Sequence, residues 1–450
     1  MSALIGLISL DLYNLSSRAQ TLSLHEDEYQ HTHLAWNSFR GKIIYRDFKE
    51  SHGPLSNLFY GFLLKIKTRA RESVSTFYYL RYFNILIIFG TAILVGLSAF
   101  RLAPQKIVPA IAILIFFTSP ATRTLAFRIR PDCYVALFSS LSFYLWLKRK
   151  HFFMGVCLGL ALGFHAKYLP INLVVLVAVW FLSQENRKPF KSILVGEALI
   201  VLSIFGWFWY HRALSFTLDG WWGNGFRTAY QRFWVERDFT RLVRVVTFSD
   251  NWMLSILILF SLVWAIYFLR RKKLKWSSDW TMGSAYSLAS LMFLFSPVWS
   301  HAFVFVLPTG LPFLVASLLS APKFRNVVPL VLVALCGFWF ISDLKQPDRG
   351  KDLLRGQLQS LDLALRETKR TDRIFYIWTS RCPAYVFNED PWRNWMNPFR
   401  RDNSTDPIRM LPPINYLSIH PMFLGLMSED ERNYIQSHFK VEGCFWSRIK

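Results

Sequence analysis

Residues 82–100 read YFNILIIFGTAILVGLSAF, a stretch with no charged side chain. A bilayer core about 30 Å thick is crossed by roughly 20 apolar residues in an α-helix. Similar apolar blocks recur along the chain, and a helix is the form in which such a block satisfies its own backbone hydrogen bonds in lipid. The sequence therefore predicts an α-helical polytopic membrane protein.

Ten apolar blocks are long enough to be considered as spans. They are 82–100, 107–122, 133–147, 152–166, 170–183, 193–210, 252–269, 281–297, 301–320 and 326–343. Met1–Leu10 is also apolar, but it has about half the length of a span and Asp11 follows it directly. We expect a short first helix there, for a total of about 10–11 transmembrane helices.

The basic residues are distributed in a way that predicts the topology. The net charge is +23, from 52 Lys+Arg against 29 Asp+Glu, and most basic clusters lie in short gaps between apolar blocks. This pattern is typical of topology signals and argues against a nucleic-acid partner. Every second gap carries such a cluster: Arg101 and Lys106, Lys148–Lys150, Arg187–Lys191, Arg270–Lys273, and Lys323 with Arg325.

If those gaps are cytoplasmic, the remaining loops face outward. The predicted outward segments are 15–80, 123–132, 167–169, 211–251, 298–300 and the tail from 344. We therefore divide the chain into a transmembrane domain at 1–343, with the external loop 15–80, and a small extracytoplasmic α/β domain at 344–450. In that tail, leucines at helical spacing predict a helix over 352–368, and a strand-like run follows at 373–378.

The cysteines show no metal-binding spacing. Cys133, Cys157 and Cys336 lie in or beside apolar blocks, and we interpret them as packing residues. Cys382 and Cys444 both lie in the outward tail, where the sequence leaves two alternatives open, a disulfide or two unpaired thiols.

Carboxylates and imidazoles are concentrated in the first outward loop. It contains His25-Glu26-Asp27-Glu28 and, further on, Glu50-Ser51-His52. A carboxylate beside low-dielectric material suits a general base, while the alternative is a solvated amphipathic helix on the membrane surface. One carboxylate and one imidazole, Glu50 and His52, are also candidate ligands of a divalent metal ion, completed by His301.

The order of these residues resembles the first external loop of the GT-C glycosyltransferases, which include the protein O-mannosyltransferases and the aminoarabinose transferases of lipid A. The residues that carry the resemblance are Asp27-Glu28, Gly41, Tyr45-x-Asp47 and Glu50-x-His52-x-Pro54-Leu55. Weaker similarities follow at Arg130-Pro131-Asp132, Lys167-Tyr168, His301…Pro308…Pro312, and Tyr376-Ile377-Trp378 with Pro383-Ala384-Tyr385. The middle loop, Asp219–Phe226, matches no pattern of that family.

The resemblance implies transfer of a sugar from a polyprenyl-phosphate donor to a lipid, glycan or protein acceptor. It implies a catalytic set of Asp27, Glu28 and Asp132, with Asp27 as the base. Cations that suit the donor phosphate are Arg128, Arg130 and Lys167. Some relatives use a divalent metal ion, for which the candidates here are Glu50, His52 and His301.

Two other classes of function remain as alternatives: a transporter or flippase of lipid-linked saccharides, and an inactive scaffold with a GT-C-like fold. Transporters usually carry ionisable residues at mid-span and show repeated halves. Here Glu197 is the clearest ionisable residue within a span, and no repeat is visible. These features favour the enzyme, placed in a bacterial inner membrane with its active site outward, or in the endoplasmic reticulum with a lumenal site.

Overall fold

The computed structural model describes most of the chain up to residue 224 and selected stretches beyond it. The described residues are 2–48, 50, 52–67, 73–119, 122–123, 126–224, 263, 278–294, 303–320, 329–334, 336–337, 350–367, 373–377, 390–394, 416–418, 429, 433, 436–437, 439–442 and 445–448. The chain forms two compact units. The first contains Met1–Ser17, Ile43–Ser56 and Tyr82–Gln346, and the second contains Arg18–Lys42, Asn57–Arg81 and Pro347–Lys450.

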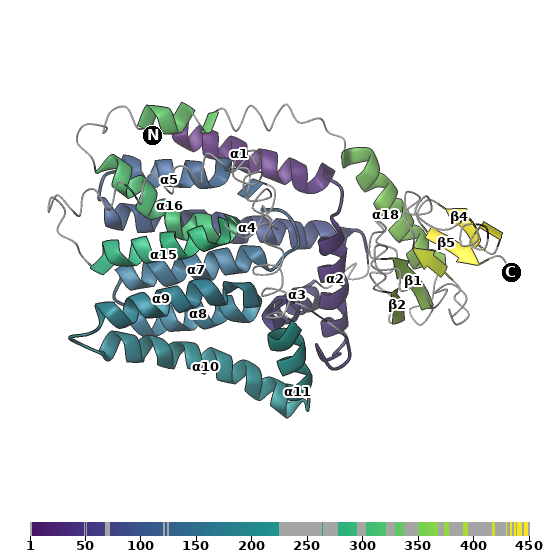
Figure 1. The fold of residues 1–450 in the computed structure, drawn as a ribbon. Helices are drawn as coiled ribbons and strands as arrows, with labels where there is room; N and C mark the ends of the chain where they lie inside the picture. Colours follow the sequence, from purple (N-terminus) through teal and green to yellow (C-terminus); the bar gives the residue numbers. More distant parts are fainter. Residues whose placement is uncertain are drawn as a thin grey trace. The chain divides into compact units, whose positions relative to one another are not determined.

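The described part of the chain is mostly helical (Figure 1). The helices with at least ten residues are α1 (Ser2–Thr21), α2 (Glu26–Phe39), α3 (Pro54–Ile66), α4 (Ser75–Leu102), α5 (Ile107–Thr118), α7 (Asp132–Leu147), α8 (His151–Phe164), α9 (Leu169–Leu182), α10 (Lys188–Tyr210), α15 (Ser278–Leu294), α16 (Phe303–Leu319) and α18 (Gly350–Glu367). Shorter turns are η1 (Ala166–Tyr168), α11 (Leu214–Thr217) and η2 (Leu218–Asn224).

The predicted apolar blocks are helical over most of the residues that the structure describes in them. Blocks 82–100, 107–122, 133–147, 152–166, 170–183, 193–210, 281–297 and 301–320 correspond to α4, α5, α7, α8, α9, α10, α15 and α16. Among the described residues, only α4 and α10, with 28 and 23 residues, are long and apolar enough to cross a membrane. All of the block 252–269 except residue 263, and most of 326–343, lie outside the described residues. The larger number of spans therefore stays a prediction.

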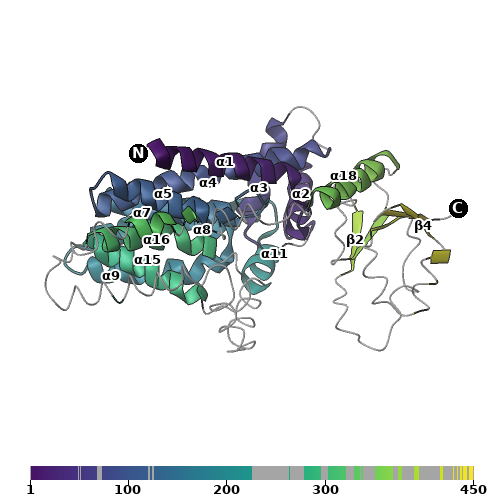
Figure 2. The same cartoon turned by 90° about the horizontal axis from the view of Figure 1, so that it is seen from above.

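The first unit is a bundle in which α7, α8, α9, α10, α15 and α16 run side by side (Figures 1 and 2). Glycines allow α8 and α10 to approach closely. A Cβ on Gly155 would lie 2.0 Å from the Ile193 carbonyl oxygen, and one on Gly196 would lie 2.1 Å from that of Phe152. Small residues at a helix contact allow backbones to pack closely where lipid supplies no hydrophobic driving force.

The outer surface of α10 is apolar. Val195, Leu199, Leu202 and Trp209 are each at least half exposed, although all have large apolar side chains. In water such a surface would mark an association site, whereas lipid tails would cover it without cost. The exposed face therefore fits the length and hydropathy of α10 as a membrane-crossing helix.

The first helix differs from the short helix that we expected. α1 continues through Asp11 to Thr21, and the carboxylate of Asp11 is buried within it in an ion pair with Arg123. A buried charge is tolerated when an opposite charge neutralises it. The sequence pattern at Met1–Leu10 identified the apolar part of the helix but could not show this partner.

The second unit combines α2 and most of α3 with the tail. Gly61 of α3 lies against α2, where an added Cβ would be 3.1 Å from the Ala35 carbonyl oxygen. In the tail, α18 accompanies a five-stranded sheet with the order β2-β1-β3-β5-β4. The strands are β1 (Arg373–Ile377), β2 (Asp390–Asn394), β3 (Tyr416–Ser418), β4 (Phe439–Glu442) and β5 (Phe445–Arg448). β1 is parallel to β2 and β3, whereas β5 is antiparallel to β3 and β4.

The thiols of Cys133, Cys157 and Cys336 are buried and unbridged, as expected of packing residues. Cys382 and Cys444 lie outside the described residues.

Candidate functional site

Asp27 and Glu28 lie in the first turn of α2, in the second unit. His25 caps this turn: its Nδ1 accepts a hydrogen bond from the Asp27 backbone N–H at 3.3 Å. The His25 backbone N–H in turn donates to Oε2 of Glu28 at 2.9 Å. This reciprocal capping satisfies two backbone donors that a helix start leaves without helical partners. The cap therefore fixes where α2 begins and how the acidic pair is presented.

Glu28 is fully buried and is held by Arg81, which lies in the first turns of α4. Nε of Arg81 donates to Oε1 at 2.7 Å, and Nη2 donates to Oε2 at 2.7 Å. The two side chains are both 0% exposed. A bidentate pair of this kind has the geometry in which guanidinium and carboxylate interact most strongly.

Arg81 also binds the backbone of the segment that leads into α2. Its Nη1 donates to the carbonyl oxygens of Ala19 and Leu22 at 2.8 and 2.9 Å, and its Nη2 donates to that of Ser23 at 3.1 Å. One side chain thus caps the end of α1 and neutralises the carboxylate at the start of α2. We call Arg81, Glu28 and these three carbonyl groups the Arg81 clamp.

The two members of the acidic pair differ in accessibility. The Asp27 side chain is 22% exposed and lies 3.4 Å from Nδ1 of His25, whereas Glu28 is enclosed in the Arg81 clamp. A group that takes a proton from a substrate must be reachable. Of the two carboxylates, Asp27 is therefore the one that a substrate could reach, while Glu28 is held by Arg81.

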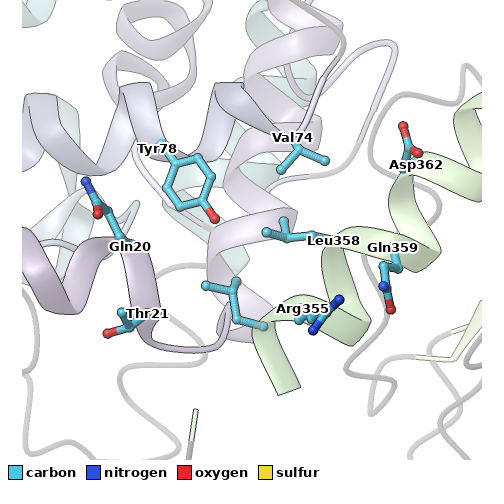
Figure 3. Close-up of a pocket in the computed structure, with 9 residues that line it drawn as sticks. Gln20, Thr21, Val74, Tyr78, Arg355, Leu358, Gln359 and Asp362 are labelled. Carbon is cyan, nitrogen blue, oxygen red and sulfur yellow. The ribbon is translucent and has the colours of Figure 1, made fainter. Parts of the chain in front are cut away.

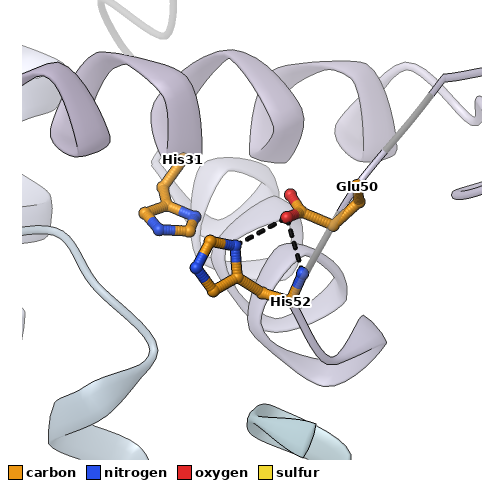
Figure 4. Close-up of side chains that lie close together, drawn as sticks. All are labelled: His31, Glu50 and His52. Atoms are coloured by element: carbon orange, nitrogen blue, oxygen red, sulfur yellow. Dashed lines mark hydrogen bonds and ion pairs between the residues drawn. The ribbon is translucent and has the colours of Figure 1, made fainter. Parts of the chain in front are cut away.

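Glu50 and His52 form a second polar cluster, in the first unit (Figure 4). Oε1 of Glu50 accepts from the His52 backbone N–H at 2.8 Å and is 2.7 Å from Nδ1 of the same residue. The Glu50 side chain is fully buried and that of His52 is 17% exposed. The His52 ring meets the buried His165 ring edge to face, with centroids 5.0 Å apart.

The loop that carries this cluster is anchored by Tyr45. The hydroxyl of Tyr45 donates to the His52 carbonyl oxygen at 2.6 Å, and its ring packs on Phe208 of α10. Burial, together with the nearby charge of Glu50, raises the pKa of the Tyr45 hydroxyl well above its usual value. It therefore stays a neutral donor. The backbone of Tyr45 has a φ of 67°, a conformation that residues other than glycine rarely adopt.

Gly53 brings the same loop against the end of α8. A Cβ at Gly53 would lie 2.1 Å from the Gly163 carbonyl oxygen and 2.6 Å from the carbonyl carbon of Phe164. Both contacts are with backbone atoms, which a small rotation cannot move aside. This close approach explains how His52 reaches His165, the residue that follows α8.

Arg130 and Asp132 form an ion pair at the start of α7. Nε of Arg130 lies 2.8 Å from Oδ2 of Asp132, and both side chains are buried. Tyr134, two residues after Asp132, stacks on Phe164 with ring centroids 4.7 Å apart. Its hydroxyl donates to Asn84 Oδ1 at 3.0 Å. The start of α7 and the end of α8 therefore lie together.

The predicted cations differ in their surroundings. Arg128 places its guanidinium over the Phe127 ring, and its carbonyl oxygen accepts from Asn84 Nδ2 at 2.5 Å. Arg130 already has Asp132 as a counter-charge. Lys167 is part of the turn η1. His301 lies outside the described residues, as does the middle loop beyond residue 224.

Glu50 and His52 are of types that bind divalent metal ions, and they lie close enough to share one. A metal ion bound by both side chains would replace the contact of 2.7 Å between Oε1 of Glu50 and Nδ1 of His52. Catalytic zinc sites usually have three protein ligands. The described residues of the first unit supply these two, so the third donor that we predicted, His301, is untested.

Two residues with clear structural roles escaped the sequence reasoning. Arg81 directly precedes the apolar block at 82–100, and a lone arginine in that place is usually taken for an interfacial anchor. His165 ends an apolar helix with no motif around it.

No protein-family model matches this chain, and neither does any curated protein. The interpretation therefore rests on the residues and their geometry.

Proposed function

We propose that this protein is a polytopic membrane glycosyltransferase of the GT-C type. It moves a sugar from a polyprenyl-phosphate donor to a lipid, glycan or protein acceptor on the extracytoplasmic side, and the bacterial inner membrane is the setting that fits best. The observation that carries the proposal is the arrangement of the acidic pair. The Asp27 side chain is accessible at the capped start of α2, while the neighbouring Glu28 is buried in an ion pair with Arg81.

The composition of the second unit supports the assignment of sides. It combines Arg18–Lys42 and Asn57–Arg81 with the tail from Pro347. Alternating basic gaps predict that both the first loop and the tail face outward. The second unit thus joins the first predicted outward loop to the predicted outward tail, as we expect if both lie on one side of the membrane.

The proposed reaction is an inverting displacement at the anomeric carbon of the donor sugar. The acceptor oxygen forms a bond to that carbon, and the bond between the carbon and the phosphate oxygen breaks. The acceptor proton passes to the Asp27 carboxylate, and polyprenyl phosphate leaves with the electron pair. General-base catalysis of this kind contributes about 10²- to 10⁴-fold to the rate.

The leaving phosphate needs cations more than it needs an acid. We assign this role to Arg128, Arg130 and Lys167, the cations that the sequence places in predicted outward loops. The Arg130–Asp132 pair then positions the start of α7. If a divalent cation takes part, Glu50 and His52 are its ligands and it would add positive charge for the phosphate.

Transport of a lipid-linked saccharide is the second candidate, and Glu197 is the observation that favours it. Its carboxyl group lies in α10 and accepts from Asn172 Nδ2 of α9 at 2.5 Å. An ionisable residue within a span is a functional candidate by default. One hydrogen-bonded carboxyl also stabilises a helix contact, so we rank transport second.

Transfer in detergent separates the two candidates. Purified full-length protein is mixed with a radiolabelled polyprenyl-phospho-sugar and membrane extract as acceptor, with no sealed compartment present. A transferase gives a labelled acceptor and free polyprenyl phosphate. A transporter gives neither, because transport needs two compartments. If no labelled product forms in detergent while sealed vesicles translocate the donor, the proposal is wrong.

A further inference from the structure

A pocket of about 470 Å³ lies in the second unit, between the end of α1, the start of α4 and one face of α18 (Figure 3). Its wall includes Gln20 and Thr21 from α1, Tyr78 from α4, and Leu358, Gln359 and Asp362 from α18. The volume is within the range of small-molecule sites. None of the residues that we assign to catalysis lines this pocket.

The walls of the pocket are fixed by two sets of buried hydrogen bonds. Gln357 of α18 accepts from the Leu24 backbone N–H at 2.8 Å and donates to the Leu24 carbonyl oxygen at 3.1 Å. Its side chain is 2% exposed. The Arg81 clamp holds the end of α1 through the carbonyl oxygens of Ala19 and Leu22. The pocket is therefore formed before any ligand arrives, which lowers the entropy cost of binding.

The lining suits a neutral ligand with many hydroxyl groups. The Tyr78 ring and Leu358 supply an apolar wall, and Figure 3 shows the Tyr78 hydroxyl turned toward α18. Gln20 and Gln359 carry amides, which both donate and accept hydrogen bonds. Arg355 and Asp362 add one charge of each sign, so the lining carries no excess charge that would select a phosphate or a cation. A sugar ring matches this set, because its C–H face is apolar and its rim both donates and accepts.

We propose that this pocket binds the saccharide part of the acceptor. The identification of this saccharide as the acceptor rests on the proposed transferase function, whereas saccharide binding itself is inferred from the pocket alone. The pocket and Asp27 belong to the same unit, and Gln357 joins α18 to the segment that leads into α2. The lining residues therefore determine which sugar is accepted, while Asp27 performs the chemistry.

Direct binding without donor tests the proposal. Full-length protein is placed in lipid nanodiscs, which contain no sugar-headed detergent. Saturation-transfer NMR is then measured with methyl glycosides of glucose, galactose, mannose, arabinose and N-acetylglucosamine. We expect at least one glycoside to bind. Leu358→Trp, which fills the pocket, and Asp362→Asn, which removes a charged acceptor, should each weaken that binding about tenfold or more.

The matched control is Asp279→Asn. Asp279 also pairs with an arginine, Arg149, but it lies in the first unit and outside the pocket. It should leave glycoside binding unchanged. Thermal melting of each variant reports folding, and Asp362 is about half exposed, so its replacement leaves the fold intact even if the tryptophan does not.

Two results would overturn the proposal: no glycoside binds, or one binds equally to wild type, Leu358→Trp and Asp362→Asn. The outcome for the transferase is separate. If the protein transfers sugar but binds no glycoside, the pocket proposal is wrong and the transferase proposal stands. If glycosides bind in a way that depends on the pocket but no transfer occurs, the saccharide site is confirmed and the transferase proposal is wrong.

Discussion

Replacing Arg81 by alanine tests the clamp that holds the acidic pair. The guanidinium makes five hydrogen bonds of 2.7–3.1 Å, two to Glu28 and three to backbone carbonyl groups. Removing it leaves the Glu28 carboxylate buried without its counter-charge. Breaking a buried pair from one side costs about 3–5 kcal/mol. Since 1.4 kcal/mol is a factor of ten, local opening of residues 19–28 should become about 10²- to 10⁴-fold more frequent.

Hydrogen exchange of the backbone amides of residues 19–28, measured in nanodiscs, reports this opening. The control is Arg366→Ala, which removes an exposed i,i+4 pair with Asp362 and should change stability by less than about 0.5 kcal/mol. Combining Arg81→Met with Glu28→Leu removes both charges, so it should cost less than the sum of the single changes. Exchange in Arg81→Ala at the wild-type rate, or strict additivity in the double variant, would refute the role given to this pair.

Three further outcomes follow from other contacts. Gly53→Ala should displace the Glu50 loop, because the added Cβ meets the Gly163 carbonyl oxygen at 2.1 Å; a faster exchange of amides 50–56 checks this, and unchanged exchange contradicts it. Asp11→Asn should destabilise the first unit by about 3–5 kcal/mol by leaving Arg123 buried without a counter-charge, which a lowered midpoint of thermal unfolding would show. Burial lowers the pKa of Lys67 to about 8, so its neutral fraction falls as the pH drops below 8 and approaches one as the pH rises above it. At pH 8 the neutral fraction of Lys67 should therefore exceed that of an ordinary lysine by about 100-fold, and competitive acetylation followed by mass spectrometry should show preferential labelling.

The positions of the helices could be predicted because an apolar block in lipid satisfies its backbone hydrogen bonds within the segment only when it is helical. α7, for example, begins at Asp132 and ends at Leu147, against a predicted block of 133–147. α1 was predicted too short, because its stabilising partner Arg123 lies 112 positions away in the chain. A pattern search that uses nearby residues does not find such a pair.

The sequence supplies the residue types of the candidate site but not their contacts. The resemblance assigns the base to Asp27, whereas the burial of Glu28 against Arg81, 53 positions further on, could not be predicted from the local sequence. In the same way, nothing local connects Gln357 with Leu24, which is 333 positions away. Long-range hydrogen bonds of this kind depend on how the helices pack, and the packing cannot be predicted from the sequence of any one segment.

The single-turnover rate of sugar transfer in Asp27→Asn tests the central claim most directly. The amide keeps the size of the side chain and removes its ability to take the acceptor proton, so the rate should fall by about 10²- to 10⁴-fold. Asp279→Asn, the same change at an ion-paired site outside the pocket and the acidic pair, should transfer at the wild-type rate. If Asp27→Asn transfers sugar as fast as wild type, Asp27 is not the base and the account of the acidic pair is wrong.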